Sequence, residues 1–316
     1  MKIHTLDTHF QGMAQVTAVY LLIGPDGPAL VETGPGSTIP AVVDALAAHG
    51  YQPGDIGQVL LTHIHLDHVG AAGWWAQQGA HIYVHRVGAP HLIDPSRLMA
   101  SAGRIYGDLM EPLWGEMLPV PEERLTALDD GDVVQAGGLA VTALDTPGHA
   151  YHHHTYVLET DEGRLAFTGD AGGINLPQVN IVDLPAPPPE FHLETWLATL
   201  DRLAAQNLAL LYPTHYGLVM DAAAQIATLR ALMIEAVEFI AGHVRDQMGG
   251  APGDPFPATI DASARSALLE EYVAWNRRRA AAGGLSPEAI RRYELANPLF
   301  MSVDGILRYL RKRETG

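Results

Sequence analysis

The sequence contains no cysteine among its 316 residues. Disulfide bonds, thiolate metal ligands and a cysteine nucleophile are therefore excluded, and this composition is compatible with a cytoplasmic enzyme. No apolar run approaches the ~18 residues that a membrane-spanning helix needs, and the first ten residues lack the apolar segment of a secretory signal. We therefore expect a cytoplasmic protein without a membrane partner.

Basic residues are also scarce. The chain has 19 lysines and arginines against 36 aspartates and glutamates, which gives a formal net charge of −17. A surface with this charge repels the phosphate backbone, so nucleic acid is not expected as a partner. Basic residues cluster at 277–279 and 308–313, where helical patterns favour solvated helix faces. We expect a small-molecule substrate instead.

Apolar periodicity divides the chain into two parts. Short apolar runs, separated by turns, predict strands mixed with helices through the first 219 residues. Beyond that point the apolar period changes from two to about 3.6, which predicts only helices. We therefore predict a mixed α/β domain over residues 1–219 and an all-helical extension over residues 220–316.

The densest polar motif directly follows a predicted strand at 56–61. Within six residues the motif places His63, His65, Asp67 and His68. Imidazole binds zinc, iron and copper, and a carboxylate adds the negative charge that holds a second cation nearby. Because burial without a cation would leave several of these groups without partners, we interpret the motif as a metal site.

Three further candidate ligands stand at the ends of later predicted strands: His149, Asp170 and His215. Glycines beside Asp170 allow close approach of the backbone. A single histidine in such a position is weak evidence. Three strand-end candidates after a His-x-His-x-Asp-His motif form a consistent set.

With these seven positions, the sequence resembles the metallo-β-lactamase-fold hydrolases, in the branch with His-x-His-x-Asp-His followed by His, Asp and His. The match covers about residues 2–219, and the stretch 83–107 resembles a poorly characterised bacterial and archaeal subfamily. A more distant resemblance is to glyoxalase II. The resemblance implies an α/β fold of the αββα type, in which two mixed β-sheets pack face to face with helices outside.

The resemblance also implies a binuclear metal centre, most simply with two Zn²⁺ ions, although iron or manganese would suit the same ligands. One metal would be bound by His63, His65 and His149, and the second by Asp67, His68 and His215, with Asp170 bridging them. A hydroxide shared by the metals would attack the carbonyl carbon of an ester, thioester or lactone. The catalytic carboxylates Asp67 and Asp170 would orient it and pass its proton to the leaving group.

Some features separate this sequence from well-known branches of the fold. The cysteine ligand of clinical zinc β-lactamases is missing, and glyoxalase II carries Gly-His-Glu-Tyr where this chain has Thr214-His215-Tyr216. Acyl-homoserine lactonases have a tyrosine soon after the bridging aspartate, where Gly172 stands here. These differences argue against β-lactams, glutathione thioesters and homoserine lactones as native substrates.

Two other functional classes stay open on this fold. A mononuclear iron oxygenase of the persulfide dioxygenase type would use two histidines and an aspartate, and the complete second ligand set argues against it. A non-catalytic sensor would be expected to have lost ligands, whereas this sequence has all seven. Metal analysis and oxygen uptake would discriminate between these classes.

Residues outside the ligand set are candidates for weaker roles. His85, Tyr106 and Tyr216 are candidate substrate contacts. Among the histidines at 152–154, one is a candidate to hydrogen-bond a ligand, with surface or strand-pairing roles as the alternative. The helical extension either stabilises the core or also walls the cleft or buries a homodimer surface. The candidates for that second role are Leu268, Leu269, Tyr272 and Trp275.

Overall fold

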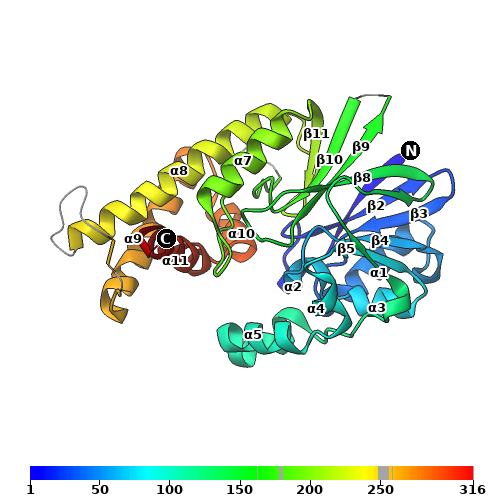
Figure 1. Cartoon of the computed structure of the whole chain (residues 1–316), viewed down its shortest axis with the longest axis horizontal. Helices are drawn as coiled ribbons and strands as arrows, with labels where there is room; N and C mark the ends of the chain where they lie inside the picture. Colours follow the sequence, from blue (N-terminus) through cyan, green and yellow to red (C-terminus); the bar gives the residue numbers. More distant parts are fainter. Residues whose placement is uncertain (162, 178–180, 248–255, 258, 316) are drawn as a thin grey trace.

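Two β-sheets pack face to face in the computed structural model, and helices cover their outer faces (Figure 1). The structure describes residues 1–161, 163–177, 181–247, 256–257 and 259–315. This arrangement confirms the predicted αββα sandwich of two mixed sheets. Within the described residues, no helix combines the length and the hydropathy that crossing a membrane requires.

The first sheet has six strands in sequential order. They are β1 (Lys2–Asp7), β2 (Ala18–Gly24), β3 (Gly27–Val31), β4 (Gln58–Leu60), β5 (His81–His85) and β6 (Leu125–Leu128). The first three pair antiparallel, and β3 to β6 pair parallel. Helices α1 (Ile39–Ala48), α2 (Leu66–Val69) and α3 (Ala72–Gln77) connect the parallel strands. The carboxyl ends of β3 to β6 therefore lie at one edge.

The second sheet has five strands, and each strand lies next to the strands that precede and follow it in the sequence. They are β11 (Leu208–Pro213), β10 (Gly163–Gly169), β9 (His154–Thr160), β8 (Leu139–Asp145) and β7 (Val133–Ala136). Strands β10 and β11 pair parallel, and the other neighbours pair antiparallel. Because β8 and β10 both run opposite to β9, they point in the same direction. The carboxyl ends of β8, β10 and β11 therefore lie at a common edge.

The continuous apolar run of β2 shows why the sequence specifies a sandwich. Tyr20 and Leu22 face the core between the sheets, whereas Val19 and Leu21 belong to the core beneath the outer helices. Side chains alternate across a strand, so a strand covered on both faces must be apolar at every position. All four residues are fully buried.

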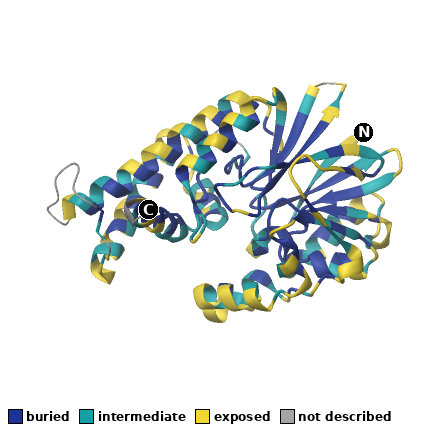
Figure 2. Ribbon diagram, in the orientation of Figure 1, coloured by how far each residue is buried: buried dark blue, intermediate teal, exposed yellow. Residues whose placement is uncertain are grey.

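Between β5 and β6 the chain forms three short helices: α4 (Ala89–Ile93), α5 (Ser96–Tyr106) and α6 (Met110–Trp114). Figure 2 shows that much of α5 is exposed, unlike the strands beside it. Helix α5 projects from the sandwich toward the helices at the end of the chain (Figure 1). Helix α5 therefore forms a separate wall beside the edge at which the carboxyl ends of β3 to β6 lie.

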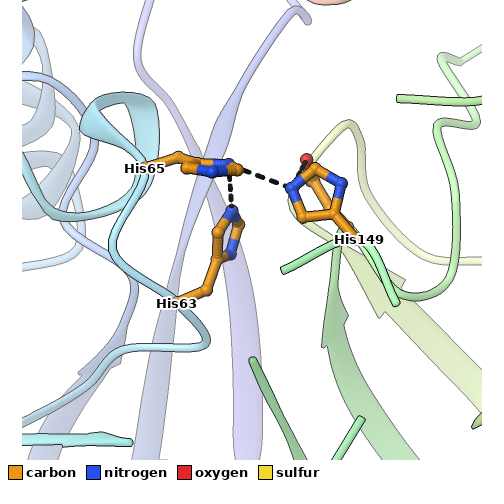
Figure 3. Close-up of side chains that lie close together, drawn as sticks. His63, His65 and His149 are labelled. Atoms are coloured by element: carbon orange, nitrogen blue, oxygen red, sulfur yellow. Dashed lines mark hydrogen bonds and ion pairs between the residues drawn. The ribbon is translucent and has the colours of Figure 1, made fainter. Parts of the chain in front are cut away.

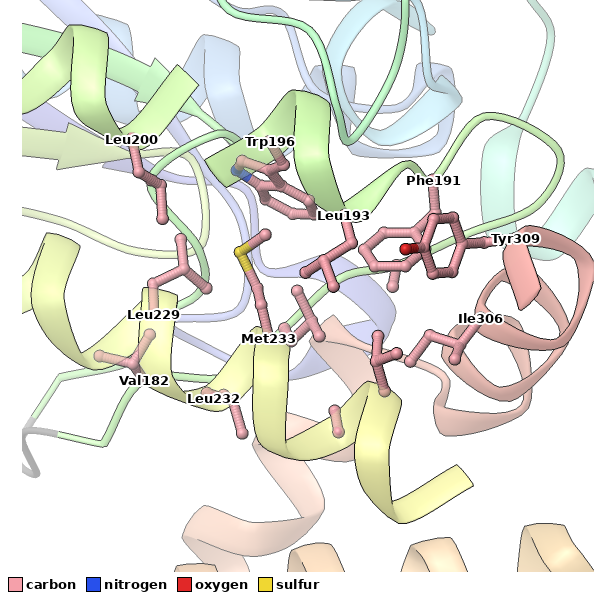
Figure 4. Packing of buried hydrophobic residues seen from close by; sticks show 14 of the residues in the cluster. Val182, Phe191, Leu193, Trp196, Leu200, Leu229, Leu232, Met233, Ile306 and Tyr309 are labelled. Atoms are coloured by element: carbon pink, nitrogen blue, oxygen red, sulfur yellow. The ribbon is translucent and has the colours of Figure 1, made fainter. Parts of the chain in front are cut away.

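The C-terminal helices pack on the second sheet. They are α8 (Ala222–Gln247), α9 (Ala262–Ala282), α10 (Pro287–Ala296) and α11 (Leu299–Thr315), and α7 (Leu193–Ala204) precedes them. One apolar core joins α7, α8, α9 and α11 to the outer face of the sheet; Figure 4 shows Trp196 of α7, Met233 of α8 and Ile306 of α11 among its residues. The apolar period of about 3.6 produces a stripe on α8 that is buried in this core, at Ile226, Leu229, Met233, Val237 and Ile240.

Two of the residues expected to wall a cleft or bury a dimer surface lie elsewhere. Leu268 and Tyr272 are buried inside the same helical core, with 0% and 1% exposure. Leu269 and Trp275 pack partly buried against it. Their apolar character is explained by internal packing, because α9 is covered by α8 and α11.

Candidate metal centre

The seven predicted ligands all follow strand ends, and the topology brings them to one edge of the sandwich. His63 and His65 follow β4, and α2 carries the next two candidates. In the second sheet the remaining candidates follow β8, β10 and β11, and they are His149, Asp170 and His215. The structure groups the seven side chains into two sets, within each of which one ligand atom per residue lies within 4.8 Å of the others.

The first set consists of His63, His65, His149 and Asp170. His65 Nδ1 lies 2.9 Å from His63 Nε2 and 2.9 Å from His149 Nε2, so three imidazole nitrogens face one another (Figure 3). Oδ2 of Asp170 lies 3.4 Å from His149 Nε2. This arrangement offers three nitrogens and one oxygen to a single cation.

The second set consists of Asp67, His68 and His215. His215 Nε2 lies 3.2 Å from Oδ2 of Asp67. The other oxygen of Asp170, Oδ1, lies 3.4 Å from His68 Nε2 and 3.7 Å from His215 Nε2. The two oxygens of Asp170 thus face different sets, which is the placement a bridging carboxylate needs.

Hydrogen bonds at the far side of three rings determine which nitrogen faces the centre. Nδ1 of His149 donates to the Pro185 carbonyl at 2.8 Å, and Nδ1 of His215 donates to the Val16 carbonyl at 2.9 Å. Nδ1 of His68 donates to Oε1 of Glu32 at 3.0 Å. Each ring therefore presents the lone pair of Nε2 inward, as metal-binding histidines do.

Glu32 is a buried carboxylate behind the centre that the sequence analysis did not identify. Its exposure is 0%, and Oε1 also accepts from the hydroxyl groups of Thr62 at 2.5 Å and Thr214 at 3.0 Å. It follows β3, next to β4, so one acid links the ends of β3, β4 and β11. The only signal in the sequence was an acid directly after a buried strand.

Two buried atoms test whether these residues suit a metal. Nε2 of His68 and Oδ1 of Asp170 have no hydrogen-bond partner within the described part of the chain. Such groups are costly to bury alone, and a cation between them would satisfy both. The donor set is nitrogen and carboxylate oxygen throughout, which suits zinc, iron or manganese. The residues therefore fit divalent transition metals.

The pKa values of two ligands, His65 and Asp67, agree with this fit. For His68 and His215 burial lowers the pKa, but the carboxylates of Asp67 and Asp170 outweigh it and raise that pKa. Burial, followed by the neighbouring His149, lowers the pKa of His65 to about 3. Burial raises the pKa of Asp67, but His68 and His215 outweigh it and lower that pKa to about 2. Neutral imidazole and ionised carboxylate are the forms that bind metal.

His153 holds the segment that carries Asp170. Its Nε2 accepts from the backbone N–H groups of Asp170 at 3.2 Å and Ala171 at 3.3 Å, while Nδ1 lies 2.8 Å from Thr146 Oγ1. Gly169 has a φ of +49°, and a methyl group there would lie 2.4 Å from Thr62 Oγ1. Of the three consecutive histidines, His153 is thus the one that orients a ligand.

A cavity of about 410 Å³ opens beside the centre, and five of the candidate ligands lie in its floor: His65, Asp67, His149, Asp170 and His215. One wall comes from the segment around α5, with Leu98, Ala102 and Tyr106. The opposite wall comes from the turn between α10 and α11, with Leu295, Ala296, Pro298 and Met301. The helical extension therefore lines the cavity, through residues other than those predicted.

The three candidate substrate contacts have different positions. Tyr106 lines the cavity, as predicted. His85 and Tyr216 are not among the described residues that line it, so their predicted contact with substrate is not supported. Tyr216 borders a separate surface hollow with Leu218 and Met220. His85 stands at the carboxyl end of β5, at the same edge as the ligands, but its Nε2 lies 3.3 Å from Asp145 Oδ1, outside the cavity lining.

His85 belongs to another cluster, with Asp145 and His154. Oδ1 of Asp145 lies 2.8 Å from His154 Nε2 and 3.3 Å from His85 Nε2. Nδ1 of His85 accepts from the N–H of Val87 at 3.0 Å, so in the neutral ring Nε2 carries the proton. The proton on His85 Nε2 points to Asp145, which makes this cluster a hydrogen-bonded one.

Comparison with known proteins gives a consistent family. The model of the metallo-beta-lactamase superfamily matches residues 13–215. A metallo-beta-lactamase family protein of Thermus thermophilus has the same fold, with a TM-score of 0.66 and 23% identity over 98% of this chain and 93% of that one.

Curated relatives are more distant in length or identity. An atrochrysone carboxyl ACP thioesterase of Aspergillus novofumigatus is 28% identical over 216 residues, which are 68% of this chain and 53% of that protein. A metallo-beta-lactamase fold-containing protein of Sulfurisphaera tokodaii is 22% identical over 255 residues, 79% of this chain and 90% of that protein. The chain thus spans about half the length of the fungal relative.

Proposed function

The chain belongs to the metallo-β-lactamase superfamily, whose members are hydrolases, and from this premise we propose that it is a binuclear metal-dependent hydrolase of carboxylic thioesters, esters or lactones. The observation that carries the proposal is the placement of Asp170. Its two oxygens face two separate sets of histidine and aspartate side chains, each able to hold one ion. A centre for a single ion would not need the second set.

The first ion would be held by His63, His65 and His149, the second by Asp67, His68 and His215, with Asp170 shared. When bound, such ions supply Lewis acidity and activate water for attack on a carbonyl carbon. Asp67 lies in the cavity floor with 22% of its side chain exposed, whereas Asp170 is 5% exposed. Asp67 is therefore the carboxylate that can accept a proton and pass it to a leaving group.

The walls of the cavity support a substrate with a sizeable apolar group. Phe10, Trp114 and Tyr106 continue the apolar surface of the α5 side, and the turn between α10 and α11 faces it. Burial of an acyl or aryl group here would contribute about 25 cal/mol per Å² of apolar area removed from water. The thioesterase among the relatives supports a thioester as the first substrate to test.

The test is elemental analysis of the purified protein together with a panel of substrates. We expect about two equivalents of transition metal per chain and hydrolysis of thioesters or esters with apolar acyl groups. One equivalent of iron, with oxygen uptake in place of hydrolysis, would contradict the proposal and favour an oxygenase. Full metal occupancy without turnover of any ester, thioester or lactone would also contradict it.

A further inference from the structure

The cavity has a polar corner that the metal centre does not use. His152 and Glu190 both line the cavity, and neither belongs to the two ligand sets. His152 lies in the turn after the ligand His149, and Glu190 ends the proline-rich segment before α7. Their side chains are 8% and 22% exposed, so the corner is enclosed but reachable from the cavity.

Hydrogen bonds set the roles of the two side chains. Nδ1 of His152 accepts from the backbone N–H of Ile64 at 3.4 Å, so the proton of the neutral ring is on Nε2. Nε2 lies 3.4 Å from Oε2 of Glu190, and that oxygen accepts from the Tyr151 N–H at 2.8 Å. The corner therefore offers one donor, on His152, and one acceptor, on Glu190.

The distance between His152 Nε2 and Glu190 Oε2 indicates that the two side chains do not fully satisfy each other's hydrogen-bonding capacity. In the cluster around Asp145, the corresponding contacts are 2.8 Å long from His154 and 3.3 Å long from His85. At 3.4 Å the contact of His152 with Glu190 is longer than the 2.7–2.9 Å or so that is typical of charge-assisted bonds. A third group that accepts from the imidazole and donates to the carboxylate would complete both.

We propose that His152 and Glu190 bind a hydroxyl group on the substrate and thereby select for it. A hydroxyl both accepts and donates, which matches the pair. An ammonium group could not accept from His152, a carboxylate would be repelled by Glu190, and a carbonyl could not donate to Glu190. This inference rests on the proposed hydrolysis and deepens it by naming a feature of the substrate.

The position of the corner indicates where the hydroxyl lies. The His152 ring stands beside the ligand rings, with centroids 5.7 Å from His65 and 6.1 Å from His63. The corner therefore lies beside the ligand rings and not at the point where the ligand atoms meet. We infer a hydroxyl beyond the α carbon of the acyl group.

The experiment compares matched substrates on the metal-loaded protein. The kcat/KM for the 3-hydroxybutyryl thioester of N-acetylcysteamine should exceed that for the butyryl thioester by about tenfold or more, because a site built around a hydroxyl leaves polar groups unpaired with the deoxy analogue. His152→Phe, which keeps a ring, and Glu190→Leu should each bring this ratio close to one. Loss of folding or metal would lower both rates and leave the ratio unchanged.

A matched control is Glu235→Leu, at an exposed position of α8 that is not among the described residues lining the cavity. It should keep the preference of the unmodified protein. Equal rates with the two thioesters, or a preference that survives both substitutions, would overturn the inference.

A binding measurement separates this inference from the proposed function. By calorimetry, the metal-loaded protein should bind 3-hydroxybutyrate more tightly than butyrate, and His152→Phe should remove the difference. If no thioester is hydrolysed but this difference is present, the proposed hydrolysis fails and the hydroxyl site stands. If thioesters are hydrolysed but the acids bind equally, the hydroxyl site fails alone.

Discussion

Two clusters of histidine and aspartate lie in this molecule, and they differ in where their protons point. In the cluster of seven, the Nδ1 protons of His68, His149 and His215 go outward to Glu32 and to two carbonyl groups. In the cluster of three, Nδ1 of His85 is the acceptor and its Nε2 faces Asp145. In the first cluster the lone pairs of these imidazole Nε2 atoms face the centre of the cluster. In the second cluster the proton on His85 Nε2 faces the carboxylate of Asp145.

This difference shows that composition alone does not identify a metal site. Both clusters contain histidines and a carboxylate within a few ångströms. The larger one leaves His68 Nε2 and Asp170 Oδ1 without hydrogen-bond partners among the described residues. In the smaller one His154 Nδ1 also has none there, but it is the nitrogen that does not face Asp145. A cation would satisfy the two atoms of the first cluster, whereas in the second cluster Asp145 is the partner of His154 Nε2.

The largest expected effect is the loss of metal from the first cluster alone. His63→Ala removes one nitrogen, and Asp170→Asn weakens the shared carboxylate, so each should lower the metal content and remove most hydrolysis. His154→Ala, in the second cluster, should retain both ions. Elemental analysis of the three purified variants checks this, and metal loss in His154→Ala with retention in His63→Ala would reverse the comparison.

A smaller effect on metal affinity is expected from replacing the carboxylate that faces a histidine proton. This carboxylate is Glu32 behind the first cluster and Asp145 within the second. Glu32→Gln weakens the acceptor for the Nδ1 proton of His68, and such outer partners typically change metal affinity by about 10- to 100-fold. Asp145→Asn is the matched substitution in the second cluster, and it should leave the affinity unchanged. Competition with a chelator measures both, and equal affinities would show that Glu32 does not act on the ligand.

The second cluster should contribute to the pH dependence of stability. Burial, followed by the nearby His85, lowers the pKa of His154 from 6.5 to about 4. Between these values the unfolded chain binds the proton and the folded chain does not, so the free energy of unfolding falls as the pH decreases. The slope for one proton is at most about 1.4 kcal/mol per pH unit.

His154→Gln should make this slope shallower, since glutamine can donate to Asp145 without titrating. Urea unfolding of the metal-loaded protein and of the variant, between pH 6.5 and 5, measures the difference. Parallel pH profiles would show that His154 is not buried as a neutral ring.

The smallest effect is expected at His85. His85→Gln removes the ring that accepts from Val87 and contacts Asp145, so the free energy of unfolding should fall by about 1 kcal/mol. Because His85 is not among the described residues that line the cavity, KM should stay unchanged. A raised KM with an unchanged free energy of unfolding would show that His85 contacts the substrate.

The first cluster was predictable because each ligand follows an apolar strand directly. Strand ends of the same direction meet at one edge, so His149, Asp170 and His215 could be placed together from sequence alone. The helices after residue 220 were predictable from their apolar period of about 3.6, and Ser286 caps α10, with its hydroxyl accepting from the Ala289 N–H.

Other parts of the site depend on contacts that no local pattern encodes. Glu32 acquires its role from Thr62 and Thr214, which lie 30 and 182 positions away. The sequence pattern of α9 suggested Leu268 and Tyr272 as residues of a cleft wall or a dimer surface, because it does not show that α8 and α11 cover them. The polar corner exists because the turn that carries His152 lies beside the segment that carries Glu190. Their approach follows from the packing of α7.

The two walls of the cavity lie outside the strand ends that carry the ligands. One is inserted between β5 and β6, and the other follows the last ligand by about eighty residues, at Leu295 to Met301. The side chains named in these walls make none of the hydrogen bonds by which Glu32, Pro185 and Val16 hold the ligands, although Asn297 in the second wall binds the Leu184 carbonyl next to Pro185. Proteins related to this chain can therefore differ in substrate through changes in one wall at a time, while the residues of the metal centre stay the same.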